Sequence, residues 1–108
     1  MTDQVTMIDV ATLRSWLDAG EVVLVDVREP HEFAAGHIKG AILKPLSTWD
    51  PDELPEVPAG KKLVLQCRSA NRCGVATANL LENGYQGKIH RLAGGFLAWV
   101  AAGQPQEV

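Results

Sequence analysis

Short apolar runs alternate with helix-like patterns along most of the chain. Continuous aliphatic and β-branched runs are typical of strands buried on both faces. Such a run predicts a strand at residues 22–25, and we expect further strands at 41–43, 63–66 and 89–92, with another short one possible at 5–8. Between them, apolar residues recur at helical spacing. These segments predict a helix from Asp9 to Gly20, a short one from Pro30 to Ala35, one after residue 72 ending near Gly84, and a last one over residues 96–100.

The alternation of strands and helices indicates the fold class. Parallel strands need crossover connections, and helices normally provide them. We therefore expect an α/β fold with a mostly parallel, five-stranded sheet and helices on both faces. Residues 45–60 interrupt this pattern with four prolines, so they should form a connection with at most one helical turn, at residues 52–54.

Length, composition and charge narrow the class of protein. The 108 residues suit one domain spanning 1–108, and 46% apolar with 21% charged residues is ordinary for a folded domain. A formal net charge of -3 does not indicate overall electrostatic attraction to nucleic acid or to an anionic membrane. The amino-terminal residues lack a secretory pattern, and the weakly polar stretch 93–103 is too short to cross a bilayer. We therefore expect a soluble cytoplasmic protein.

Cys67 stands where a buried strand should pass into a helix. Ligands of open α/β sheets bind beyond the carboxyl ends of the strands, and helix N-termini favour anions. Thiols in such positions near arginine commonly have pKa values of ~3.5 to 7.5 rather than ~8.5. We therefore predict that Cys67 is a nucleophilic thiolate. The alternative is a small apolar side chain packed after the strand.

Charged residues surround this position. Arg68 and Arg72 flank the same loop and can recognise an oxyanion such as a sulfonate or a phosphate. At the carboxyl end of another predicted strand, Asp26 is a candidate to orient Arg68 or the loop backbone, and Arg28 a candidate to bind substrate. A salt bridge that only joins strand to helix explains these two residues equally well.

Cys73, the second of the two cysteines, falls in the first turn of the following helix. Its distance from Cys67 matches neither a zinc site nor a Cys-x-x-Cys redox motif. We expect a small side chain packed against the sheet, with a resolving or second sulfur-carrying thiol as the alternative. The three histidines are scattered, so we expect no metal and no cofactor.

Several motifs occur in the order found in one family, and the chain resembles rhodanese-like domains over nearly its whole length. The matching segments are Asp-Val-Arg-Glu at 26–29, Glu-Phe at 32–33, Gly-His-Ile-Lys-Gly-Ala at 36–41, the loop 67–72, and residues 92–95, 99 and 103–105. The resemblance implies a five-stranded parallel sheet, a persulfide on Cys67 and a sulfane donor such as thiosulfate. It also implies an active-site loop made of Cys67, Arg68, Ser69, Ala70, Asn71 and Arg72.

Two positions depart from the family pattern. Ala70 stands where many family loops have Gly, and Cys73 stands where Ser or Thr is frequent. If position 70 needs a left-handed backbone, Ala costs on the order of 1 kcal/mol there.

The function expected from this resemblance is a thiosulfate sulfurtransferase. Its partners would be a small sulfur donor, thiosulfate or a persulfide, and an acceptor such as cyanide, a small thiol, thioredoxin or another protein; neither nucleic acid nor membrane is expected. A phosphatase or arsenate reductase of the same fold is the first alternative. Related phosphatases use a Cys-x5-Arg loop, whereas Cys67 to Arg72 is Cys-x4-Arg. A non-catalytic domain that binds a partner protein is the second alternative.

Overall fold

The structure, a computed structural model, describes residues 4–69 and 71–108. Its centre is a five-stranded sheet in the order β1-β5-β4-β2-β3, and every pair of neighbouring strands is parallel. The strands are β1 (Val5–Ile8), β2 (Val22–Asp26), β3 (Ile42–Leu43), β4 (Lys62–Gln66) and β5 (Ile89–Leu92). The predicted α/β fold and its five strands are confirmed.

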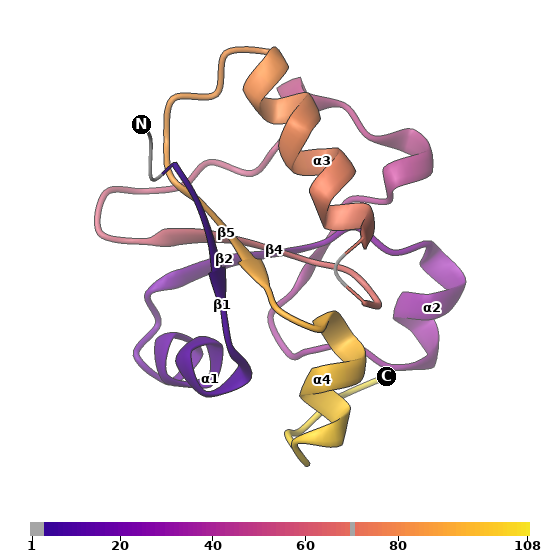
Figure 1. Cartoon of the computed structure of the whole chain (residues 1–108). Helices are drawn as coiled ribbons and strands as arrows, with labels where there is room; N and C mark the ends of the chain where they lie inside the picture. Colours follow the sequence, from indigo (N-terminus) through magenta and orange to yellow (C-terminus); the bar gives the residue numbers. More distant parts are fainter. Residues whose placement is uncertain (1–3, 70) are drawn as a thin grey trace.

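Helices cover both faces of this sheet, as Figure 1 shows. They are α1 (Val10–Asp18), α2 (Pro30–Ala35), α3 (Asn71–Glu82) and α4 (Gly95–Ala101). Helix α3 packs on one face together with the proline-rich connection, while α1 and α4 pack on the other. None of the helices in the described part of the chain is long and apolar enough to cross a membrane.

Each face has its own apolar core, because successive residues of a strand point to opposite sides. On the α3 side, Leu63 and Leu65 of β4 pack with Ala76 and Leu80 of the helix. On the other side, Val64 packs with Leu13 of α1 and Trp99 of α4. Burial on both faces explains why the strands read as continuous apolar runs.

Two local expectations need correction. Helix α3 begins at Asn71, so Asn71 and Arg72 belong to its first turn and not to the preceding loop. The proline-rich connection contains two 3₁₀ turns, Leu46–Thr48 and Pro51–Glu53, where one at most was expected. Pro45 and Pro51 introduce these turns, since proline fixes a backbone angle suited to a turn and cannot continue a helix.

The register of the central strands places the segments of interest at one edge of the sheet. Asp26 at the end of β2 lies opposite Gln66 at the end of β4. The Val27 N–H continues this pairing and donates to the Gln66 carbonyl at 2.9 Å. Val27 and Cys67 therefore leave neighbouring strands at the same level, and Arg28 follows one residue later.

Candidate active site

Cys67 directly follows β4 and is buried, with 1% of its surface exposed. Its sulfur accepts a hydrogen bond from the Cys73 backbone N–H at 3.4 Å. That N–H lies in the first turn of α3, where amide groups have no partner within the helix and carry partial positive charge. The N-terminus of α3 is thus directed at the Cys67 sulfur and favours its anionic form.

Helix α4 holds the backbone on the other side of this cysteine. The N–H groups of Phe96 and Leu97 donate to the carbonyls of Cys67 and Arg68, at 2.7 and 3.0 Å. Gly95 makes this approach possible, because its φ is +60° and a Cβ there would lie 2.4 Å from the Cys67 carbonyl oxygen. The Gln66 amide nitrogen also donates to the Cys67 carbonyl, at 2.9 Å.

Arg72 lies in the first turn of α3, where it faces α2. Its guanidinium binds both carboxylate oxygens of Glu32, at 2.6 and 2.9 Å. The same carboxylate accepts the Glu29 N–H at 3.0 Å and so completes a capping box at the start of α2. The hydrogen bond with Arg72 is the main cause that lowers the pKa of Glu32 to about 2. Glu32 raises the pKa of Arg72 in turn.

Asp26 and Arg28 form a buried ion pair, with exposed fractions of 0% and 3%. Arg28 Nε and Nη2 donate to the carboxylate at 2.8 to 3.1 Å, and Nη2 also donates to the Gly36 carbonyl. The guanidinium lies 4.2 Å from the centre of the Phe96 ring in α4. The structure therefore brings Asp26 to Arg28 rather than to Arg68. A substrate role for Arg28 stays a prediction.

The rest of the predicted loop is at the surface. Arg68 and Ser69 are exposed, Asn71 is exposed at the start of α3, and Ala70 lies outside the described residues. Arg68 borders a hollow of about 220 Å³ together with Arg28, Glu32, Gly36, Phe96 and Leu97. Two of the predicted arginines thus meet at one opening beside the loop, at the carboxyl edge of the sheet.

Cys73 is fully buried beneath the loop residue Cys67. On its other side, Arg91 Nε of β5 donates to the Cys73 sulfur at 3.4 Å. Gly74 makes room for this arginine, because a Cβ there would lie 2.8 Å from Arg91 Nη2. The hydrogen bond with Cys67, and then burial, raise the pKa of Cys73.

Sequence reasoning did not assign roles to four residues that shape this site: Glu32, Gln66, Arg91 and Gly95. Glu32 and Arg91 act through partners far away in sequence, and Gly95 through a close backbone approach. Gln66 acts through the carbonyl of the next residue. The one available signal for Arg91 was a charged residue inside the short strand β5. Within the described residues, no group of three or more His, Cys, Asp or Glu is placed to hold a metal ion.

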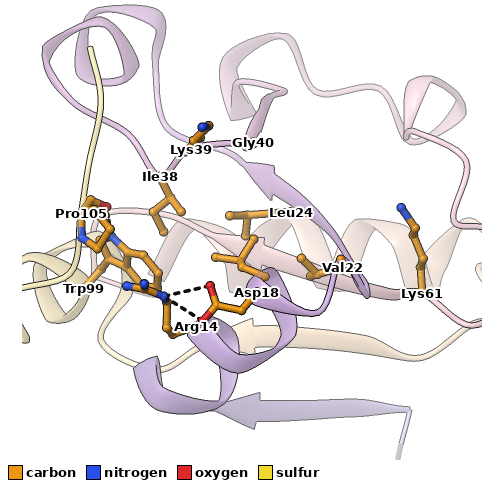
Figure 2. A pocket seen from close by; sticks show the side chains of 12 residues that line it. Arg14, Asp18, Val22, Leu24, Ile38, Lys39, Gly40, Lys61, Trp99 and Pro105 are labelled. Carbon is orange, nitrogen blue, oxygen red and sulfur yellow. Dashed lines mark hydrogen bonds and ion pairs between the residues drawn. The ribbon is translucent and has the colours of Figure 1, made fainter.

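A larger hollow lies away from this chemistry, on the α1 and α4 side of the sheet. Its volume is about 460 Å³, and Leu17, Val22 and Trp99 are among the apolar residues that line it. Figure 2 shows Arg14 at its rim, bonded to Asp18 of the same helix. None of its lining residues is a cysteine, so the candidate active site remains the loop at Cys67.

Comparison with known proteins identifies one family over most of the chain. Residues 9–102 match the model of the rhodanese-like domain. A sulfurtransferase of Allochromatium vinosum is 39% identical over 82% of this chain and 80% of its own length. An uncharacterised Synechocystis protein is 48% identical over 87% of this chain. A probable adenylyltransferase/sulfurtransferase of Mycobacterium tuberculosis is 39% identical over 89%. The chain spans about half of the Synechocystis protein and a quarter of the mycobacterial one.

Solved structures show the same architecture. A thiosulfate sulfurtransferase from Pseudomonas aeruginosa superposes with a TM-score of 0.80 and 30% identity, over 94% of this chain and 19% of its own. A rhodanese-related protein from Thermoplasma volcanium gives a TM-score of 0.78 at 28% identity, over 94% of this chain and 97% of its own.

Proposed function

Because this chain belongs to the rhodanese-like domain family, we propose that it is a sulfurtransferase that carries sulfur as a persulfide on Cys67. Thiosulfate, or a small persulfide, is the donor. The acceptor is cyanide or a thiol, provided by a small molecule, by thioredoxin or by another protein. The reaction needs neither a metal nor a cofactor, because each step is a nucleophilic displacement at a sulfur atom.

The first step is the attack of the Cys67 thiolate on the outer sulfur of thiosulfate. A bond forms between the two sulfurs, the bond from the outer sulfur to the sulfonate group breaks, and sulfite leaves with the electron pair. In the second step, an acceptor thiolate or cyanide attacks the outer sulfur of the persulfide. The Cys67 thiolate is then released for another cycle.

One observation carries this proposal: the Cys67 sulfur receives the Cys73 N–H at the N-terminus of α3. A buried anion is costly unless hydrogen bonds or charges compensate for it. Here the helix N-terminus supplies that compensation for the thiolate and for the persulfide anion. The exposed Arg68, which borders the hollow beside the loop, can attract a doubly charged donor.

Intact-protein mass spectrometry after thiosulfate treatment tests the proposal. We expect the reduced protein to gain one sulfur atom, which peptide mapping should locate on Cys67. Addition of a thiol or cyanide should remove it. Cys67→Ser should gain no sulfur, because a hydroxyl does not ionise at neutral pH as a thiol does.

The matched control is Cys73→Ser, which removes the other thiol of the chain and leaves Cys67. Sulfur found on Cys73, or an active Cys67→Ser protein, would show that the nucleophile is wrongly assigned. Hydrolysis of a chromogenic phosphate ester without any sulfur uptake would favour the phosphatase alternative instead.

A further inference from the structure

The two cysteines of this chain are in direct contact. The Cys73 N–H donates to the Cys67 sulfur at 3.4 Å, and the Cys73 thiol also hydrogen-bonds Cys67. Cys67 directly follows β4, and Cys73 lies six positions later in the first turn of α3. A thiol is therefore placed against the inner sulfur of any persulfide that forms on Cys67.

We propose that Cys73 attacks the inner sulfur of the Cys67 persulfide, which forms a Cys67–Cys73 disulfide and releases hydrosulfide. This step rests on the proposed sulfurtransferase function. The bond between Cys67 and the outer sulfur breaks as the bond between Cys67 and Cys73 forms. The thiol proton of Cys73 leaves with the outer sulfur. Cys73 is oxidised and the carried sulfur is reduced to sulfide, so the step needs no external oxidant.

The surroundings of Cys73 set the speed of this reaction. The groups that face its thiol are Cys67 from the loop and Arg91 from β5. The hydrogen bond with Cys67 and the burial of Cys73 raise its pKa, so few of these thiols are ionised at neutral pH. Arg91 opposes this effect by favouring the thiolate. The raised pKa should therefore slow the attack by Cys73, so that an acceptor can react first when one is present.

The contact gives the protein a second outcome for the same persulfide. When an acceptor is present, sulfur is transferred and both thiols survive. When acceptors are scarce, hydrosulfide leaves and the nucleophile is locked in a disulfide. A dithiol reductant must then restore the two thiols, since thiolate attack on a disulfide is the general route for opening one. Serine at position 73 could donate a hydrogen bond but could not form this disulfide.

The experiment starts from protein loaded with sulfur and freed of donor and thiols, without oxygen. Two loading reagents are used in parallel, thiosulfate and glutathione persulfide. Intact mass under non-reducing conditions and a sulfide electrode then follow the protein without any acceptor. We expect the added sulfur to disappear, a species two hydrogens lighter than the reduced protein to appear, and one sulfide to be released for each disulfide formed.

Cys73→Ser is expected to keep its added sulfur longer by on the order of tenfold or more, because it lacks the intramolecular nucleophile. Val75→Ala, at an exposed site on the same helix, should behave like the wild type. Rates that do not depend on protein concentration would show that both sulfurs belong to one molecule.

Three results would overturn the inference. The first is a loaded wild-type protein that keeps its sulfur as long as Cys73→Ser does. The second is sulfide release without a disulfide. If neither reagent loads sulfur onto any variant, the sulfurtransferase proposal falls and this inference falls with it. Loading by glutathione persulfide alone would reject only thiosulfate as the donor.

Discussion

At the scale of single residues, the site depends on two ion pairs between arginines and carboxylates. Arg72 binds a carboxylate 40 positions earlier in the chain, Glu32. This pair joins the helix that follows the nucleophile to α2. Asp26 and Arg28 make a second, fully buried pair one strand away. Arg72 and Arg28 thus bind carboxylates of the protein itself in the absence of substrate.

We predict that Arg72→Ala lowers sulfur transfer by a larger factor than it lowers stability. Loss of the pair with Glu32 should cost about 1 kcal/mol of unfolding free energy, because both side chains are partly exposed. A loop displaced by about 1 Å can lose on the order of 100-fold in rate. Urea titration and transfer kinetics per folded molecule make the comparison.

The control for this variant is Arg14→Ala, which breaks another arginine-carboxylate pair, the one with Asp18 on α1. It should lower stability slightly and leave sulfur transfer unchanged. If folded Arg72→Ala transferred sulfur at the wild-type rate, the Arg72 guanidinium would not be needed for the reaction.

The contribution of the Glu32–Arg72 pair to stability should depend on pH, because Glu32 takes up a proton in acid. Its pKa falls from 4.5 to about 2 on folding, so the pair stabilises the protein above about pH 4.5. That contribution is lost as the pH falls towards 2, where the folded form also takes up the proton. We expect Glu32→Gln to be less stable than wild type by about 1 kcal/mol at neutral pH. Near pH 2 the difference should vanish. Urea titrations of both proteins across this range check the sign.

At the scale of elements, two helices fix one cysteine from two sides. Helix α3 directs an N–H at the Cys67 sulfur, and α4 binds the Cys67 carbonyl. The second contact depends on Gly95, whose φ of +60° lies in the left-handed region. The position of the nucleophile therefore depends on how closely α4 approaches β4.

Gly95→Ala should disturb this approach. The left-handed backbone costs a residue with a Cβ about 1–2 kcal/mol, and here the Cβ would also overlap the Cys67 carbonyl. We expect a loss of more than about 3 kcal/mol in unfolding free energy, and reduced sulfur uptake per folded molecule. Gly20→Ala is the matched control, because its φ is +69° and nothing lies within 4 Å of the added Cβ. It should cost about 1 kcal/mol and leave uptake intact.

The elements themselves could be predicted, but many of their contacts could not. The central strands β2 and β4 were recognised because burial on both faces leaves continuous apolar runs. The start of α3 was placed too late, since Asn71 and Arg72 carry no apolar periodicity. The place of Cys67 between a buried strand and a helix was predicted, because it follows from the order of strands and helices. The pairing of Arg72 with Glu32 was not, because a salt bridge between distant segments leaves no local pattern.

At the scale of the whole molecule, the last residues act as part of the fold. The Pro105 carbonyl accepts the Trp99 indole N–H at 2.7 Å, and Trp99 is 1% exposed. His37 and Glu107 exchange two backbone hydrogen bonds of 2.8 Å. The tail thus joins α4 to the segment that follows α2, next to the carbonyl that Arg28 binds.

Removal of residues 104–108 should therefore destabilise the protein. A buried indole N–H without an acceptor costs about 1–3 kcal/mol, to which the two lost backbone bonds add. We expect a decrease of about 2–4 kcal/mol in urea-derived unfolding free energy. Deletion of Val108 alone is the control, because this residue is 90% exposed and should be dispensable. Equal stability of the two shortened proteins would contradict a structural role for the tail.

The pairing of β1 with β5 has a consequence for how the chain folds as it leaves the ribosome. Val5 lies opposite Ile89, so β1 cannot pair until the chain as far as β5 has been made. At synthesis rates of about 5–20 residues per second, that delay is on the order of ten seconds. During this time β1 is a short apolar segment with unpaired backbone groups. Nascent chains stalled before Ile89 are therefore expected to recruit chaperones. Chains in which β5 has left the ribosome can pair β1 with β5 and complete the sheet.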